Sequence, residues 1–225
     1  MKQKINANVQ SFKDEIENTM DVLYKNKFIY YYNLINIRRD GAYVELFCNN
    51  HIPGRANCGK AFTMLQQYEA ILNSGNFCCI LFDGSLVKLD LCFENQKLKS
   101  HSYLWWPAPY NIDYNFTEEQ SPQFVYEDFI TDYSWLEKIN MRSPIRVDYD
   151  RGNDTEGHPA VHLHTQHYNS RMKLNKPICF NRFMRFIIEN YYPDTIIDFD
   201  KWYYASFQYD ELKKDINKHT CLVLD

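Results

Sequence analysis

The chain has 225 residues, of which 45% are hydrophobic and 24% charged, and this composition excludes a disordered or low-complexity protein. A formal net charge of -4 argues against a protein that coats nucleic acid through bulk positive charge. The first residues contain no signal-peptide core and no apolar run approaches the length of a bilayer span. We therefore expect no membrane association and a cytoplasmic location.

The seven cysteines form an odd set without paired spacing: Cys48, Cys58, Cys78, Cys79, Cys92, Cys179 and Cys221. Buried free thiols in a reducing compartment are the interpretation that this set favours. An alternative is a zinc site made by Cys48, His51 and Cys58, although the spacing offers three ligands and no obvious fourth.

The first third of the chain predicts helices on either side of a hairpin. Apolar residues recur at helical spacing over about 12–26, after a capping pattern at Ser11. Residues 28–37 and 43–48 are rich in aromatic and β-branched side chains and read as a hairpin. A second helix is expected over about 58–74, where Gly75 ends the pattern.

The middle of the chain predicts an antiparallel meander over residues 77–106. Two strand-like runs flank Asp83-Gly84, the dipeptide that a type I′ turn prefers. A third strand follows over 98–106. Residues 111–122 read as a connection, and 123–138 as a short helix.

The last part predicts a second hairpin and a helix. Strands over 145–150 and 160–165 flank a loop of turn-forming residues, and a helix follows over 181–190. The last thirty residues are expected to form a peripheral helix and tail. The sequence thus predicts one α+β domain over 1–225, with a core over about 28–193, a peripheral segment over 194–225 and a mainly antiparallel sheet packed with helices.

The second hairpin carries the residues of chemical interest. Because side chains alternate across a strand, His162 and His164 share one face of their strand, as Arg146, Asp148 and Asp150 do of theirs. If the strands pair in register, imidazoles, carboxylates and a guanidinium meet on one face, and a slip of one residue separates them.

Other polar residues extend this candidate site. His158 flanks the strand, and a stretch without acidic residues follows it from Thr165 to Ile188. The stretch also contains Lys176, and we take its other four cations as candidates for binding a phosphodiester: Arg171, Lys173, Arg182 and Arg185.

Three interpretations of the cluster stay open. The histidines can be structural residues whose hydrogen bonds are satisfied in a half-buried sheet. They can bind a divalent metal ion, zinc or manganese, with Asp148 or a third histidine. They can also act as general base and acid in metal-independent phosphodiester chemistry, with Arg146 stabilising charge.

Two further patterns add alternatives. The His-hydrophobic-His pattern occurs in relaxase-type nucleases, which require a nucleophilic tyrosine, for which Tyr191 and Tyr192 are candidates by order. Trp105 and Trp106 could form a platform for stacking bases, although aromatic pairs at a strand end more often pack in a core.

Several motifs in the same order resemble a bacterial family known only as a domain of unknown function: LFDGSL (81–86), WPAP (106–109), RVDYD (146–150), HPAVHLH (158–164) and FMRFIIENYYP (183–193). This resemblance implies no activity. RVDYD and HPAVHLH are also similar to small bacterial toxins of toxin–antitoxin modules, and the positions that this likeness offers as site residues are Arg146, Asp148, His158, His162 and His164.

We therefore expect a nucleic-acid-processing protein, a nuclease or toxin-like effector of a bacterial defence or toxin–antitoxin system, acting on RNA or DNA. The rival expectation is a non-catalytic subunit that docks onto a larger ATPase or nuclease, a protein partner encoded nearby. An open cleft around the histidines would favour the enzyme.

Overall fold

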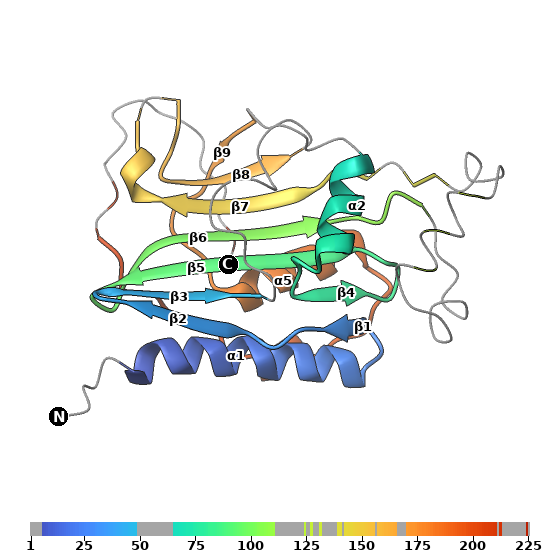
Figure 1. The fold of residues 1–225 in the computed structure, drawn as a ribbon, viewed down its shortest axis with the longest axis horizontal. Coiled ribbons are helices and arrows are strands. Elements are labelled where there is room, and N and C mark those ends of the chain that lie inside the picture. Colours follow the sequence, from blue (N-terminus) through green and yellow to red (C-terminus); the bar gives the residue numbers. More distant parts are fainter. Residues whose placement is uncertain are drawn as a thin grey trace.

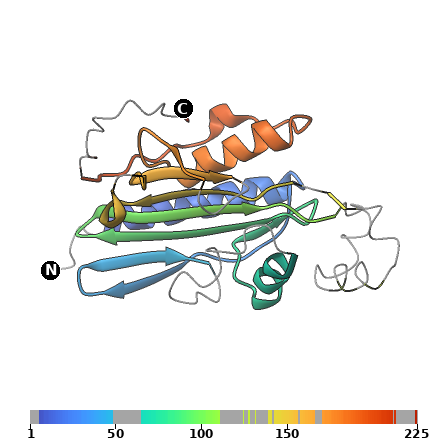
Figure 2. The ribbon, with the colours of Figure 1, turned by 90° about the horizontal axis from the view of Figure 1, so that it is seen from above.

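The computed structural model describes residues 6–48, 65–110, 124, 127, 131, 139–140, 142–155, 157–165, 170–210, 212 and 224. An antiparallel sheet of nine strands forms its centre (Figure 1). Helices α1 (Asn6–Lys25) and α5 (Phe180–Tyr191) lie on one face and α2 (Leu65–Ser74) on the other, as Figure 2 shows. The predicted α+β class with a mainly antiparallel sheet is confirmed.

The strands run in the order β1-β4-β5-β6-β7-β8-β9, and the hairpin of β2 and β3 joins the sheet beside β5. Their bounds are β1 Ile29–Tyr32, β2 Asn36–Asp40, β3 Tyr43–Phe47, β4 Cys79–Leu81, β5 Leu86–Glu94, β6 Lys97–Trp106, β7 Ile145–Asp150, β8 Val161–Thr165 and β9 Met172–Lys173. The meander and the second hairpin that the sequence predicts are both present.

Two hydrophobic clusters fill the two sides of the sheet. Tyr103, Trp105 and Val147 belong to the larger cluster, which contains the apolar stripes of α1 and α5. Leu104 and Trp106, one residue out of phase, pack in the smaller cluster with α2. The alternation of side chains along β6 therefore separates the two cores, and the rest of the second face is free to carry polar residues.

The turns of the meander differ from the expected types. Gly84 has a φ of 82°, but Asp83 is not in the positive-φ region, so the predicted type I′ turn at Asp83-Gly84 is wrong. A longer loop forms instead. In it, the backbone NH of Gly84 donates to the carbonyl of Leu81, and the Asp83 carboxylate accepts from the backbone NH of Ser85. The type I′ turn lies between β5 and β6, where Asn95 and Gln96 have φ values of 48° and 71°.

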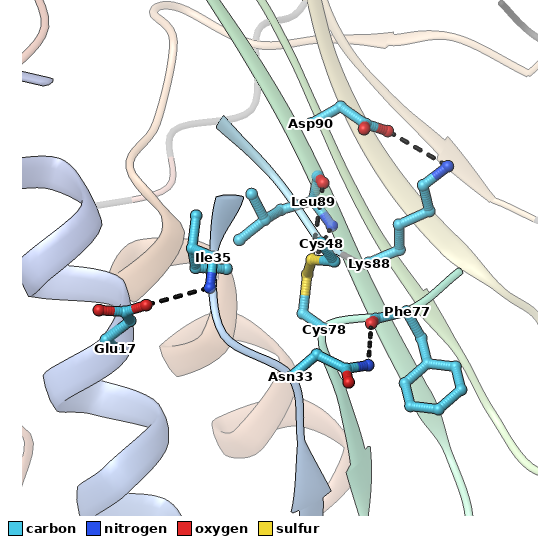
Figure 3. The surroundings of a disulfide bond; sticks show 9 residues. All are labelled: Glu17, Asn33, Ile35, Cys48, Phe77, Cys78, Lys88, Leu89 and Asp90. Carbon is cyan, nitrogen blue, oxygen red and sulfur yellow. Dashed lines mark hydrogen bonds and ion pairs between the residues drawn. A yellow bond between two sulfur atoms is a disulfide. The ribbon is translucent and has the colours of Figure 1, made fainter. Parts of the chain in front are cut away.

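The expected strand over 28–37 is divided into β1 and β2. Asn33 interrupts it, and its backbone NH and side-chain amide donate hydrogen bonds to the carbonyls of Cys78 (2.7 Å) and Phe77 (2.9 Å). The amide of Ile35 donates to Glu17 of α1 at 3.0 Å (Figure 3). These contacts direct β1 toward β4 and β2 toward β3.

Cys48 and Cys78 form a disulfide between the end of β3 and the start of β4 (Figure 3). The expectation of free thiols is wrong for these two residues, because sequence spacing does not show that the β3–β5 and β4–β5 pairings bring them together. Cys79 and Cys179 are free and buried, and Cys92 is free. The bonded Cys48 has no thiolate for the zinc site considered with His51 and Cys58, which lie outside the described residues.

The helices over 12–26 and 181–190 are confirmed as α1 and α5, and the helix over 58–74 is confirmed for Leu65–Ser74. The connection over 111–122 and most of the expected helix over 123–138 lie outside the described residues. In the described part after α5, only the 3-10 turn η3 (Phe199–Lys201) is helical. Ala205, Phe207 and Tyr209 then pack on the larger core, where Phe207 stacks on Phe12. Among the described helices, none has the length and apolar character that crossing a bilayer requires.

Candidate functional site

The register between β7 and β8 brings the predicted residues together. Asp148 lies opposite His162, and Arg146 lies opposite His164. Cross-strand partners share a face, and the intervening Val147 and Leu163 belong to the core under α1 and α5. The four polar side chains therefore occupy the opposite face of the sheet, as the in-register alternative predicts.

The Asp148 carboxylate is the centre of this cluster. Its Oδ2 accepts a hydrogen bond from Arg146 Nε at 2.7 Å and lies 3.3 Å from His164 Nε2 and 3.8 Å from His162 Nε2. Its Oδ1 accepts a hydrogen bond from Ser102 Oγ at 2.8 Å. One oxygen is thus held by β6, and the other faces the imidazoles.

The His162 ring is oriented by the chain that enters β8. Its Nδ1 lies 2.6 Å from the carbonyl oxygen of Pro159. A carbonyl only accepts, so Nδ1 carries the hydrogen and a neutral His162 presents its Nε2 lone pair toward Asp148. The rings of His158 and His164 lie on either side, with centroids 4.8 Å and 4.6 Å from that of His162.

The cluster is more enclosed than the sequence suggests. His162 and His164 are each 1% exposed, so these rings do not lie in the open cleft that would favour an enzyme. The side chains of Asp148 and Arg146 keep 17% and 13% of their surface exposed. Solvent or a ligand therefore reaches the cluster from the carboxylate and guanidinium side.

Burial and charge set the protonation of the cluster. Burial acts to raise the pKa of Asp148, but the hydrogen bond from His164 and the charge of Arg146 outweigh it, and the pKa stays well below its ordinary value. Burial lowers the pKa of His162 to about 4, against the opposing effect of Asp148. Burial also lowers the pKa of His164. Near neutral pH, a carboxylate therefore faces two neutral imidazoles.

Only some of the predicted cations lie near the cluster. Lys173 of β9 is the cross-strand partner of His162, and the charge of Arg171 contributes to the lowered pKa of His164. Arg182 and Arg185 are on α5, where they stack over Tyr204 and Phe199 at 5.1 Å and 5.4 Å. These two arginines lie on the helix side of the sheet and do not join the cluster.

The sequence did not single out the residues of β5 and β6 that extend the cluster. A row of cross-strand partners crosses five strands: Asp90, Ser102, Asp148, His162 and Lys173. Lys88, two residues from Asp90 on β5, forms an ion pair with it at 3.3 Å. Polar residues alternating with apolar ones in SLVKLDLCF were the available signal, but only the pairing order shows which strands they join.

The other candidate groups serve packing. The Tyr192 hydroxyl contacts Asp83 and accepts a hydrogen bond from Trp105 Nε1, on the face opposite His162. Tyr191 packs on the Trp105 ring with centroids 4.5 Å apart. Neither tyrosine approaches the histidines as a relaxase nucleophile would. Trp105 is fully buried and Trp106 is 5% exposed, so neither offers a stacking platform.

The cluster contains a set of potential metal ligands. One ligand atom from each of Asp148, His162 and His164 lies within 4.8 Å of the others, and no other group of three such residues occurs among the described residues. Two imidazoles and a carboxylate can accept a proton, orient a water molecule or ligate a divalent cation.

Comparison with known proteins gives one match. The sequence model of the family described as an uncharacterized conserved protein, DUF2290, matches residues 28–222. The match contains β1 to β9 and α5, and therefore every residue of the cluster. Neither the curated proteins nor the solved structures contain a match to the chain.

Proposed function

The chain belongs to the DUF2290 family, and we propose that it is a nucleic-acid-processing enzyme that hydrolyses phosphodiester bonds at the Asp148 cluster. The observation that carries the proposal is the convergence of two neutral imidazoles and a guanidinium on one ionised carboxylate. This combination supplies groups that activate water and a charge that stabilises a phosphate.

The charges around the cluster support an anionic substrate. The Arg146 side chain stays 13% exposed beside Asp148, and Lys173 lies across from His162. Arg171 contributes a buried Nε that has no hydrogen-bond partner in the described structure. A guanidinium donor without a partner is costly to bury, and a phosphate oxygen would satisfy it.

The proposed roles follow from position. An imidazole would accept a proton from the attacking water, Arg146 would neutralise charge on the phosphate, and the leaving oxygen would take up that proton as its bond to phosphorus breaks. Because access is from the side of Arg146 and Asp148, a single-stranded substrate or a flexible loop fits the cluster better than a rigid duplex. RNA and single-stranded DNA are therefore the first substrates to test.

The cellular setting is a further part of the proposal. The similarity of RVDYD and HPAVHLH to small toxins supports a cytoplasmic effector of a bacterial defence or toxin–antitoxin system. Such an effector would arrest growth when expressed alone, and His164→Ala would relieve the arrest.

A non-catalytic docking subunit is the second candidate. The observation that favours it is the burial of both imidazoles. Histidines that are only 1% exposed can stabilise the fold through hydrogen bonds as readily as they can take part in a reaction. In that case the cluster stabilises the hairpin of β7 and β8, and the protein acts through its surface.

Incubation of the purified full chain with labelled RNA and single-stranded DNA separates these candidates. We expect cleavage by the wild type and at least a ~100-fold slower reaction for Asp148→Asn and His164→Ala. Asp150→Asn is the matched control, because Asp150 lies on the same strand face and caps the 3-10 turn η2 (Arg151–Asn153), a role that asparagine keeps. Equal rates for all four folded proteins would overturn the enzymatic proposal.

A further inference from the structure

We infer that Asp148, His162 and His164 form a binding site for one divalent transition-metal ion of the zinc and manganese class. The metal would activate the water for hydrolysis, so the inference rests on the proposed function for its purpose, although its geometry stands by itself.

The neutral His162 ring presents a lone pair to the cluster. The Pro159 carbonyl fixes the hydrogen on Nδ1, so Nε2 of the neutral ring is an acceptor. This acceptor faces another acceptor, Asp148 Oδ2, at 3.8 Å. Two acceptors that face each other repel unless a hydrogen or a positive charge lies between them, and a metal ion would supply that charge.

The distances between the three ligand atoms can be compared with the distances between ligands of one zinc ion. Zinc binds nitrogen and oxygen at about 2.1 Å, so two ligands of one ion lie about 3.0 to 3.5 Å apart. His164 Nε2 is 3.3 Å from Asp148 Oδ2, which is within this range, and the His162 distance is slightly longer. All three atoms lie within 4.8 Å of one another, so the imidazoles would have to move closer together to share one ion. The His164 ring then carries its proton on Nδ1.

Neighbouring groups hold the candidate ligands in place by hydrogen bonds. Metal-binding histidines usually donate their other NH to a carbonyl or carboxylate, and ligating carboxylates are hydrogen-bonded in turn. Pro159 fills the first role for His162, and Ser102 fills the second by donating to Asp148 Oδ1 at 2.8 Å. Two of the three ligands, His162 and Asp148, are therefore oriented by groups on the segment before β8 and on β6.

Arg146 is the feature that opposes a metal. Its Nε donates to Asp148 Oδ2 at 2.7 Å, the same oxygen that would bind the ion. A carboxylate oxygen has two lone pairs, so it can serve both partners. The adjacent positive charge weakens metal binding, and the site should therefore hold an exchangeable ion rather than a permanently bound structural one.

The donor set selects the class of metal. Two imidazoles and one carboxylate suit zinc, manganese and their neighbours, whereas magnesium and calcium prefer oxygen ligands alone. Three protein ligands leave coordination positions for water and substrate, as in catalytic rather than structural sites. The ion would thus present its open side toward the accessible edge of the cluster.

Titration of the chelator-treated full chain with zinc, manganese and magnesium, followed by calorimetry, tests the site. We expect one zinc or manganese ion per chain, and at least ~10-fold weaker binding of magnesium. His164→Ala and Asp148→Asn should weaken zinc binding by at least ~100-fold, and Ser102→Ala by about 10-fold. Asp150→Asn should leave it unchanged. Circular dichroism and thermal melts establish that each variant is folded.

Cobalt substitution identifies the ligands without reference to activity. A spectrum of nitrogen and oxygen ligation that is lost in His164→Ala supports the site, whereas a thiolate charge-transfer band would place the metal on cysteine and overturn the inference. Absence of binding by the folded wild type overturns it as well. Cleavage that persists in chelator, without bound metal, removes the metal but keeps the proposed function. One ion bound without cleavage keeps the metal and removes the function.

Discussion

Two aspartate–arginine pairs in this protein have the same contact distance and different surroundings. Asp148 and Arg146 on β7 are 2.7 Å apart, and so are Asp83 and Arg142 on the other side of the sheet. Asp83 also accepts hydrogen bonds from the Tyr192 hydroxyl at 3.0 Å and, on Oδ1, from the backbone NH of Ser85. Both carboxylates are therefore well supplied with donors.

The Asp83 network connects distant parts of the chain. Tyr192, at the end of α5, is 109 residues from Asp83, and its hydroxyl also accepts from Trp105 Nε1 at 3.2 Å. The Arg142 guanidinium lies over the Trp105 and Tyr192 rings. Burial and the Asp83 charge raise the pKa of Tyr192 well above its ordinary value, so it keeps its proton. The Arg142 Nη2, Tyr192 hydroxyl and Trp105 Nε1 donors each have an acceptor in this network, which suits a structural role.

The Asp148 cluster has imidazoles where the other network has a phenol and an indole. An imidazole can donate, accept or ligate a metal, and its role changes with protonation. The same carboxylate–guanidinium contact thus has a structural role beside the phenol and indole, and we propose a chemical role for it beside the imidazoles. We expect substitutions at Asp83 to change stability and substitutions at Asp148 to change chemistry.

The largest expected effect is on the rate of phosphodiester cleavage. Asp148→Asn should slow cleavage by about 1000-fold, because it removes the charge that orients the imidazoles. Asp83→Asn should leave the rate per folded molecule within about twofold, since Asp83 lies outside the cluster. Single-turnover cleavage at a temperature where both variants are folded measures this. A comparable loss in both variants would remove the distinction between the two regions.

The next largest effect is on stability. Asp83→Ala leaves the largely buried Arg142 without its carboxylate partner, and we expect the free energy of unfolding to fall by about 4 kcal/mol. Urea denaturation measures it. Asp83→Asn keeps a hydrogen-bond acceptor and should lose less. A change below about 1 kcal/mol in the alanine variant would show that the tie is dispensable.

Much of the fold follows from local patterns in the sequence. The strands of the meander and of the second hairpin alternate apolar and polar residues, and α1 and α5 repeat apolar residues at helical spacing, so their positions were predictable. The turn at Asp83-Gly84 was not, because the carboxylate of Asp83 takes up the backbone NH of Ser85 and favours a longer loop. The disulfide of Cys48 and Cys78 depends on strand order, which local patterns do not contain.

The sequence predicted the site for one of two possible strand registers and could not choose between them. The alternation of Arg146, Asp148, His162 and His164 gives two faces, and the register decides between them. The part played by Ser102 requires the β6–β7 pairing. Burial of the imidazoles depends on packing around the whole strand, and a strand pattern of alternating residues does not reveal it.

A third expected effect concerns pH and distinguishes the imidazole cluster from the Asp83 network. The pKa of His162 is lowered from 6.5 to about 4, so the folded protein binds fewer protons than the unfolded chain in this range. The contribution of His162 to the free energy of unfolding is complete above pH 6.5, the pKa in the unfolded chain. This contribution falls as the pH is lowered and is lost as the pH falls through about 4, the pKa in the folded protein. The loss is at most about 3 kcal/mol.

Urea denaturation of metal-free protein at several pH values tests this effect. We expect the free energy of unfolding of His162→Gln to depend less on pH between 6.5 and 4 than that of the wild type. Tyr192→Phe is the matched control in the other network, and its profile should run parallel to that of the wild type. Parallel profiles for both variants would show that His162 does not titrate differently on folding.

The smallest effects come from removing one hydroxyl from each region. Tyr192→Phe leaves Trp105 Nε1 without its acceptor and removes one of the donors to Asp83, and we expect it to cost about 2 kcal/mol. Ser102→Ala removes one donor from Asp148, which keeps Arg146 as a partner, and should cost about 1 kcal/mol. Thermal and urea unfolding of both variants give the comparison. The reverse order would mean that the carboxylate at the centre of the imidazole cluster is the more important structural tie.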